Sequence, residues 1–258
     1  MKSIDITEPQ ETKKDKYQAE SDVNYSEKDT TSKTSTRSML LLLLFMMMMI
    51  NFGNIYAFDY PQLFEAQLLN QFDIKPLQVS YLYSIYSIPN FIFAPIISVI
   101  LNYTGMGFGG ILLSFLVTFS SFLMYAASKY NLFWLMMVAR AIFGVGAESL
   151  IVAQASMAEK WYTGKFLTVA LGLNQIFQLF GAASAAWLGP IIYVEKRDID
   201  WVLFVIILTC FFSWLFSIFF WIYETILDER EKKTKKVAYD HYYKQTISIN
   251  QDKHSYSR

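Results

Sequence analysis

Two charged side chains lie inside a stretch that is otherwise apolar enough to form a membrane helix. The stretch covers residues 133–165 and contains Arg140 and Glu148. A charge at the centre of a bilayer costs roughly 3 kcal/mol, and it is retained where it faces a protein interior or a wet cavity. Gly144 and Gly146 would let another backbone approach here. The pattern favours a solute pathway beside this helix over a buried arginine–glutamate pair that only holds helices together.

The spacing of the two charges excludes a direct pair within one straight helix. They are eight residues apart, which is about 12 Å along the helix axis and about 80° around it. Each therefore needs a partner on another helix, a solute or water. The predicted substrate-binding residues are these two and polar residues of the neighbouring apolar segments: Arg140, Glu148, Asn54, Tyr86, Asn90, Gln175 and Gln178. Asn51 is a further candidate partner, and Gln154 is expected nearer the cytosol.

The composition is that of an integral membrane protein. Hydrophobic residues make up 54% of the chain and charged residues 17%, whereas soluble domains have about 25% charged residues. The formal net charge is zero, so no nucleic-acid partner is expected. The chain has one cysteine, which excludes a disulfide framework. Its two histidines lie in the polar C-terminal tail, which excludes a histidine site within the membrane. With no phosphate-binding glycine loop and no metal-binding motif, we expect neither an enzyme nor a cofactor nor a metal.

Six apolar segments are each long enough to cross a hydrocarbon core of about 30 Å as a helix. They cover residues 39–58, 77–101, 107–127, 132–158, 166–193 and 201–226. The predicted fold class is therefore an all-α membrane protein with one transmembrane domain, residues 38–227. Residues 1–37 are expected to be a disordered tail. Residues 228–258 form a charged tail, in which residues 228–236 could extend the sixth helix before disorder begins.

The lysines and arginines that flank these segments predict the orientation. Nine lie on the side of the two termini and four on the opposite side, so both termini are expected in the cytosol. Pro89 and Pro95 predict a bend in the second segment. On that segment Tyr86 and Asn90 share one helix face. This face could line a pathway or belong to an interfacial aromatic belt, and the sequence leaves both alternatives open. The sixth segment is expected to face lipid and to carry no chemistry.

Several of these stretches resemble a known family. Residues 140–146, RAIFGVG, resemble the fourth-helix RxxxGxG motif of the major facilitator superfamily. Six spans with both ends cytosolic resemble the N-terminal half of that twelve-helix fold. FGNIYAFDYP, YSIYSIPN, and FWLMMVARAIFGVGAESLIVAQ followed by KWYTGK resemble the branch named major facilitator superfamily domain-containing protein 1. The similarity extends over about residues 39–227.

The resemblance implies a transporter that works by alternating access. Members of that branch are lysosomal dipeptide uniporters that associate with a glycosylated single-span accessory protein. By this resemblance, Arg140 would meet the carboxylate of a peptide and Glu148 its amine. The turn between the second and third helices departs from the family, because Asn102 stands where charged residues are usual.

A second departure is that the chain supplies one six-helix half, whereas the superfamily binds its substrate between two. A second half would have to come from another chain, a homodimer or a longer parent protein. The alternative is a half-size or truncated membrane protein that binds a membrane partner and does not transport.

Overall fold

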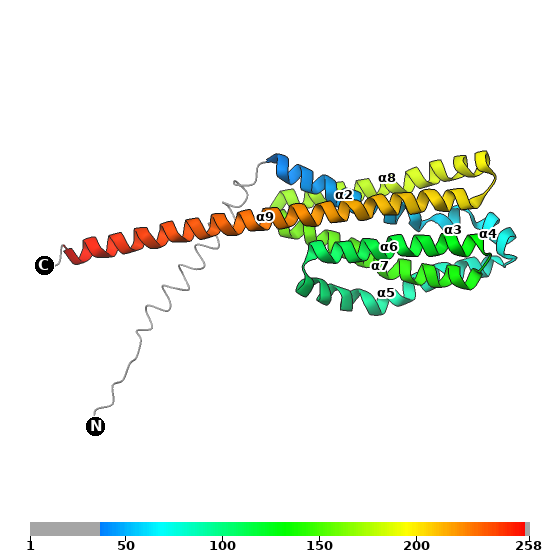
Figure 1. Ribbon diagram of the computed structural model, residues 1–258, viewed down its shortest axis with the longest axis horizontal. Helices are drawn as coiled ribbons and strands as arrows, with labels where there is room; N and C mark the ends of the chain where they lie inside the picture. The colour runs from blue at the N-terminus through cyan, green and yellow to red at the C-terminus, as the bar shows by residue number, and fades with distance from the viewer. Residues whose placement is uncertain (1–36, 256–258) are drawn as a thin grey trace, which may run out of the picture. The chain divides into compact units, whose positions relative to one another are not determined.

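The structure is a computed structural model that describes residues 37–255, with side chains described except at 37, 94, 98, 102, 235 and 238–255 (Figure 1). The predicted disordered tail lies outside these residues apart from residue 37. Every regular element in the described part is a helix. The helices are α2 (Arg37–Phe58), α3 (Tyr60–Leu63), α4 (Glu65–Phe72), α5 (Pro76–Thr104), α6 (Met106–Lys129), α7 (Phe133–Trp161), α8 (Gly164–Lys196) and α9 (Ile199–Ser255).

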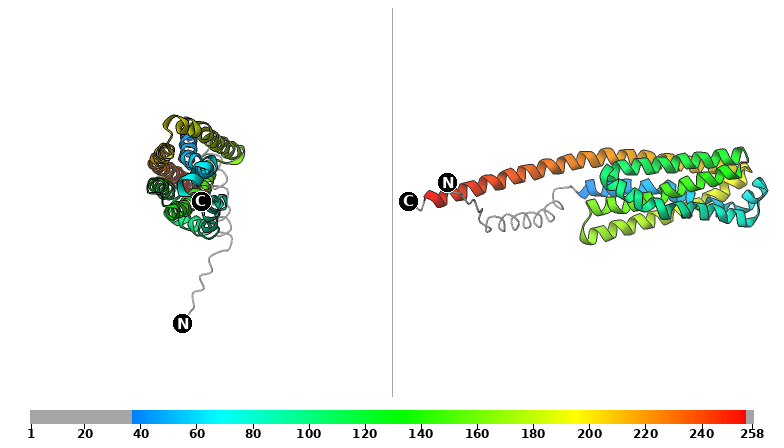
Figure 2. Two further views of the ribbon diagram at one scale, coloured as in Figure 1. Left: turned by 90° about the vertical axis from the view of Figure 1, so that its right-hand side faces the viewer. Right: turned by 90° about the horizontal axis from the view of Figure 1, so that it is seen from below.

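The chain divides into two units. The unit Leu42–Arg230 contains the helical bundle and every contact discussed below. Within it, the long helices run side by side, as the end-on and side views show (Figure 2). The other unit contributes, among the described residues, the first turn of α2 and the helical residues 231–255.

The described helices confirm the six predicted apolar segments, each of which falls inside one long helix except that the fourth begins at Leu132, the N-cap of α7. By length and composition, five of these helices could cross a membrane, and α5 makes a sixth if its two bent parts are counted as one span. The bend between Pro76–Phe93 and Pro95–Leu101 is 41°. Pro95 has no backbone N–H, and its ring would clash with the carbonyl four residues earlier. The predicted bend is therefore present at Pro95, whereas the helix continues through Pro89.

The connection between α2 and α5 contains two short helices that the sequence analysis did not predict. Helix α2 ends at Phe58, and Asp59 begins the four-residue α3, which has a proline in its first turn. Helix α4 follows and ends at Phe72, and its C-cap residue Asp73 adopts a left-handed conformation with φ 50°. Asp59 therefore separates α2 from α3, directly after Phe58, whose carbonyl contacts Arg140.

Glycines let α7 pack closely against two helices. A Cβ atom at Gly144 would overlap the backbone carbonyl of Tyr86 on α5. A Cβ atom at Gly146 would lie 3.2 Å from the carbonyl of Leu113 on α6. The predicted close backbone approach is therefore confirmed, and the two glycines face two different neighbours. Helix α7 is the most buried of the candidate spans, so its polar side chains depend on these neighbours for their partners.

The expectation that the sixth segment faces lipid is wrong for one of its faces, which is buried. The Ser213 hydroxyl accepts a hydrogen bond from the Gly53 amide at 2.8 Å and donates to the Met49 carbonyl at 2.9 Å. The Cys210 thiol donates to the Gly53 carbonyl at 3.3 Å. Cys210, Ser213 and Ser217 recur at spacings of three and four and are all buried, so they share one helix face. That face packs on α2, where Gly53 leaves room for it.

Helix α9 is also longer than the predicted sixth segment. It continues through the charged stretch to Ser255, beyond the extension over residues 228–236 that the sequence analysis allowed. Asp228 precedes Lys232 by four residues and Glu229 precedes Lys233 by four, a spacing that stabilises helices. Near the end of the bundle, Lys160 of α7 pairs with Glu224 at 2.9 Å and with Asp228 at 2.8 Å. These ion pairs join α7 to α9.

Candidate functional site

Arg140 is fully buried between three helices. Its Nη2 group donates a hydrogen bond of 3.0 Å to the carbonyl of Phe58, the last residue of α2. The guanidinium carbon also lies 5.3–5.5 Å from the ring centroids of Tyr83, Tyr86 and Phe143. These distances are typical of cation–π attraction, which strengthens in a desolvated site. The arginine is therefore held by one carbonyl and three aromatic rings.

The guanidinium of Arg140 is only partly satisfied by hydrogen bonds. Its Nε and Nη1 atoms are buried, and the described residues offer them no acceptor. Buried polar groups are nearly always paired, and an unpaired charged group is especially costly. A guanidinium presents its donors in a planar fork that fits a carboxylate. The free part of this fork could therefore bind an anionic group.

Tyr86 lies between the two charges of α7. Its hydroxyl donates a hydrogen bond of 2.7 Å to Oε1 of the half-buried Glu148, while its ring faces Arg140. Within the described residues, ion pairs are formed by Lys160 and not by Arg140. The structure therefore does not contain the direct arginine–glutamate pair of the alternative interpretation. The opposite charges are separated by one tyrosine ring, which the close approach at Gly144 brings into place.

Asn90 and Asn54 lie beside these charges, and each keeps one buried oxygen unpaired. Asn90 donates from Nδ2 to the Tyr86 carbonyl at 2.9 Å, and Asn54 donates to the Ala147 carbonyl at 3.2 Å. The Oδ1 atoms of both asparagines are buried without a donor among the described residues. The site thus combines unpaired donors on Arg140 with unpaired acceptors on two asparagines.

A second polar cluster is centred on Gln154, toward the other end of α7. Its Oε1 atom accepts from Asn51 at 2.6 Å and from Gln178 at 3.0 Å. Its Nε2 atom donates to the Met47 carbonyl at 2.6 Å and to Asn174 at 3.2 Å. The cluster joins α2, α7 and α8. The sequence analysis did not include Gln154 in the site, and its helical register with the asparagines of neighbouring spans is visible only in the packed structure.

The seven predicted residues therefore fall into three groups. Arg140, Glu148, Tyr86, Asn90 and Asn54 lie around the two charges. Gln178 belongs to the cluster around Gln154. Gln175 is exposed on α8 and belongs to neither cluster, because it lies about 100° around the helix from the buried Asn174.

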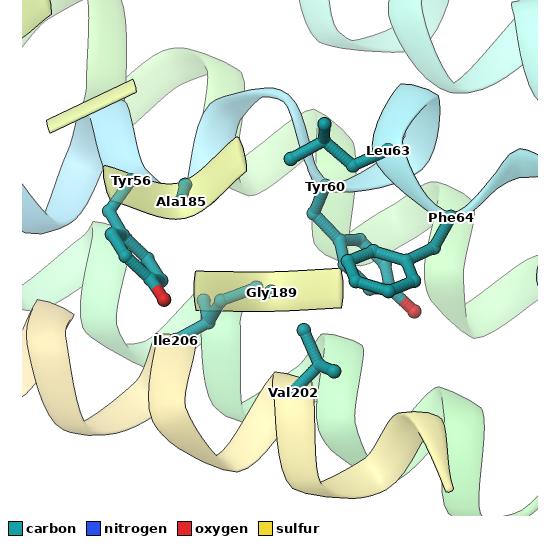
Figure 3. A pocket seen from close by; sticks show the side chains of 8 residues that line it. All are labelled: Tyr56, Tyr60, Leu63, Phe64, Ala185, Gly189, Val202 and Ile206. Atoms are coloured by element: carbon teal, nitrogen blue, oxygen red, sulfur yellow. The ribbon is translucent and has the colours of Figure 1, made fainter. Parts of the chain in front are cut away.

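A small cavity lies where α2 and α3 meet α8 and α9. It is lined by Tyr56, Tyr60, Leu63, Phe64, Ala185, Gly189, Val202 and Ile206. Figure 3 shows the rings of Tyr56 and Tyr60 extending from α2 and α3 toward α8 and α9. None of the predicted site residues lines it. It is mostly apolar, and we do not assign the charged site to it.

The described residues hold no group of three or more histidine, cysteine, aspartate or glutamate side chains placed to bind a metal ion. The chemistry that these residues offer is ionic contact and hydrogen bonding. A buried arginine with free donors, a carboxylate and two free amide oxygens could bind a small molecule that carries both charges. The geometry therefore suits solute binding.

Comparison with known proteins also supports a solute-binding membrane protein. A sequence profile of the Major Facilitator Superfamily matches residues 36–249. Zebrafish (Danio rerio) has a relative named lysosomal dipeptide transporter MFSD1, which is 32% identical over 126 residues, or 48% of this chain. The human (Homo sapiens) protein of that name is 31% identical over 126 residues, and the chicken (Gallus gallus) protein is 26% identical over 150 residues. The matches span 27% to 29% of the length of these relatives.

The profile match covers most of the chain, and the spanning helices agree with one half of the twelve-helix fold of this family. The zebrafish and human relatives align with less than half of this chain. The family therefore rests on the profile together with the helical architecture. This chain is a multi-pass membrane protein that belongs to the Major Facilitator Superfamily.

Proposed function

We propose that the chain forms one wall of a pathway for a small zwitterionic solute of the dipeptide class. Arg140 would bind the carboxylate of the solute and Glu148 its ammonium group. The observation that carries this proposal is the buried guanidinium of Arg140, whose Nε and Nη1 atoms have no acceptor among the described residues. A purely structural arginine at this depth would be expected to have its donors filled.

The neighbouring polar groups support a ligand with two charges. Glu148 is half-buried and oriented by the Tyr86 hydroxyl. The free Oδ1 atoms of Asn54 and Asn90 can accept hydrogen bonds from an ammonium or a peptide N–H. Gln178 and Gln175 are more distant from the charges, and we assign them orientation of the solute from the α8 side.

The proposal needs a second wall. Transporters of this kind bind their solute near the bilayer midplane, between two repeats that rock against each other. The second six-helix half would come from a longer form of this protein, a second copy or a separate chain. Helix α8 is the least buried candidate span, with 17% of its window buried inside the unit, which leaves a large face for such a contact.

The location and accessory partner are part of the same proposal. The relatives are named lysosomal transporters, and we infer a lysosomal membrane with both chain termini on the cytosolic side. A glycosylated single-span protein would accompany the chain there. The charge count of the flanking residues supports the orientation.

Uptake into liposomes tests the proposal. Purified full-length chain, reconstituted with any co-purifying partner, should take up radiolabelled L-alanyl-L-alanine, and Arg140→Leu should abolish this uptake. Arg197→Asn is the matched control, because it removes an exposed arginine from the C-cap of α8, where φ is 56° and asparagine is tolerated. Equal amounts of folded protein in the liposomes must be verified. Unchanged uptake by Arg140→Leu would exclude the proposed role.

The second candidate function is a membrane protein that binds a partner without transporting. The exposed amide of Gln175, at membrane depth on the sparsely buried α8, favours it, because an amide in lipid is costly without a partner. This function predicts no flux from the purified chain in liposomes, together with co-purification of another membrane protein. Flux that depends on Arg140 would exclude it.

A further inference from the structure

Asp59 stands at the break between α2 and α3, directly after the carbonyl that holds Arg140. That carbonyl belongs to Phe58 and accepts from Nη2 of Arg140 at 3.0 Å. Asp59 is half-buried, and its carboxylate does not cap the short helix that it begins. An acidic side chain is therefore held next to the buried arginine by the backbone, without being used for the local structure.

The backbone holds Asp59 beside Arg140, yet the two groups do not form an ion pair. The Phe58 carbonyl that accepts from Arg140 belongs to the peptide unit that leads into Asp59, whereas Glu148 is held by Tyr86. Among the described residues, Arg140 and Asp59 have no ionic contact within 4 Å. The Tyr83 ring lies 5.4 Å from the guanidinium carbon, and its hydroxyl accepts a hydrogen bond from the Gln62 amide, three residues after Asp59. Asp59 therefore lies next to the arginine without saturating it.

We propose that Asp59 is the resting counter-ion of Arg140, and that the carboxylate of an incoming solute displaces it. This inference rests on the proposed function, because it concerns the same arginine. A buried cation without a nearby negative charge is strongly unfavourable, so the empty site requires a substitute for the solute. Asp59 supplies that substitute as the single turn residue between α2 and α3.

The proposed exchange predicts which solutes the site prefers. A solute that carries a carboxylate replaces the charge that it displaces, so Arg140 remains compensated throughout. A neutral solute cannot do so, and it would leave Asp59 in place. Asp59 therefore lowers the affinity for carboxylates by competing with them, while it hardly affects neutral analogues. This residue positions and tunes Arg140 and is not expected to contact the solute.

Binding measurements on the full-length protein, with any co-purifying partner, test the exchange. The probes are L-alanyl-L-alanine and its C-terminal amide, measured by calorimetry in detergent. In Asp59→Asn the dipeptide should bind several-fold more tightly than in the wild type, and the amide should bind equally in both. Asp59→Glu should behave as the wild type. Asp73→Asn is the charge-matched control, since Asp73 is exposed at the left-handed end of α4, and it should change neither affinity.

The ratio of the two affinities remains informative if Asp59→Asn is less stable, because the folded fraction affects both probes equally. An unchanged or smaller preference for the dipeptide in Asp59→Asn, with wild-type binding that depends on Arg140, overturns the exchange alone. Absence of Arg140-dependent dipeptide binding in the wild type overturns the proposed function and the exchange together. A several-fold gain that disappears in the double variant with Arg140→Leu supports both.

Discussion

Helix α7 carries two polar clusters that lie in the same apolar setting and use their hydrogen-bonding groups differently. In the cluster around Gln154, the amide oxygen accepts two hydrogen bonds and the amide nitrogen donates two. In the cluster around Arg140, one guanidinium nitrogen donates to a carbonyl and the other two have no acceptor among the described residues. Saturated polar groups stabilise and specify a packing. Unsaturated ones are costly and are typical of a place where a ligand completes the network.

The comparison assigns different roles to the two clusters. The Gln154 cluster holds α2, α7 and α8 in register. Within the described residues, its one buried polar group without a partner is Nδ2 of Asn174, so this cluster offers fewer free groups to a solute. The Arg140 cluster joins α2, α5 and α7 mostly through aromatic contacts and leaves donors and acceptors free. Asn54 connects them, because its Nδ2 atom donates both to Asn51 of the first cluster and to the Ala147 carbonyl beside Glu148. The variants below test stability and solute binding separately in the two clusters, in order of decreasing expected effect.

Arg140→Leu should remove dipeptide uptake entirely and leave the thermal stability of the empty protein unchanged or increased. Arg140 is a buried cation with two unpaired nitrogens and no ion pair within 4 Å among the described residues, so its desolvation opposes folding, and leucine removes that cost. Uptake into liposomes and thermal unfolding in detergent measure the two effects. A large loss of stability would show that Arg140 has a structural role and would contradict the difference between the two clusters.

Gly144→Ala should disturb the Arg140 cluster through the backbone. The added methyl group would overlap the Tyr86 carbonyl, so α5 must move away, at a cost of about 3 kcal/mol for an overpacked core. Both stability and uptake should fall. Gly172→Ala is the matched control, because a Cβ atom there meets nothing within 4 Å. Equal behaviour of the two variants would show that the close approach does not assemble the site.

Gln154→Leu should lower the free energy of unfolding by about 2 kcal/mol, because four partners lose their hydrogen bonds and interhelical bonds in membranes are individually modest. The affinity of the remaining folded protein for the dipeptide should stay close to that of the wild type. Gln175→Leu, on the exposed face of the neighbouring helix, is the control and should not destabilise. A selective loss of affinity in Gln154→Leu would place this cluster in the solute pathway.

Tyr86→Phe should have the smallest effect. It keeps the ring that faces Arg140 and removes the hydroxyl that orients Glu148 at 2.7 Å, which is worth about 1 kcal/mol. The affinity for the dipeptide should fall roughly fivefold to tenfold, and that for a carboxylate lacking an amine, such as an N-acetylated dipeptide, should not change. Tyr81→Phe, at an exposed position of the same helix, serves as control.

Much of the architecture was predictable from the sequence, and the site was predictable only in part. The six apolar segments and the bend at Pro95 appear in the helices, and Arg140 and Glu148 lie within the candidate span α7. Gln154 was left out of the site because its polarity alone does not reveal its partners. Gln175 and Gln178 were predicted together, although they are three residues apart on α8 and only Gln178 reaches a cluster.

The sequence by itself determined which stretches form long apolar helices and which charged residues lie within them. These are local properties, set by hydrophobic length and by the cost of charge in hydrocarbon. The tertiary structure alone decided that Tyr86 separates the two charges, that Gln154 is saturated and that Asp59 lies beside Arg140. The physical reason is that the rotation of each helix about its axis depends on packing against its neighbours, here through the contacts that Gly144 and Gly53 permit.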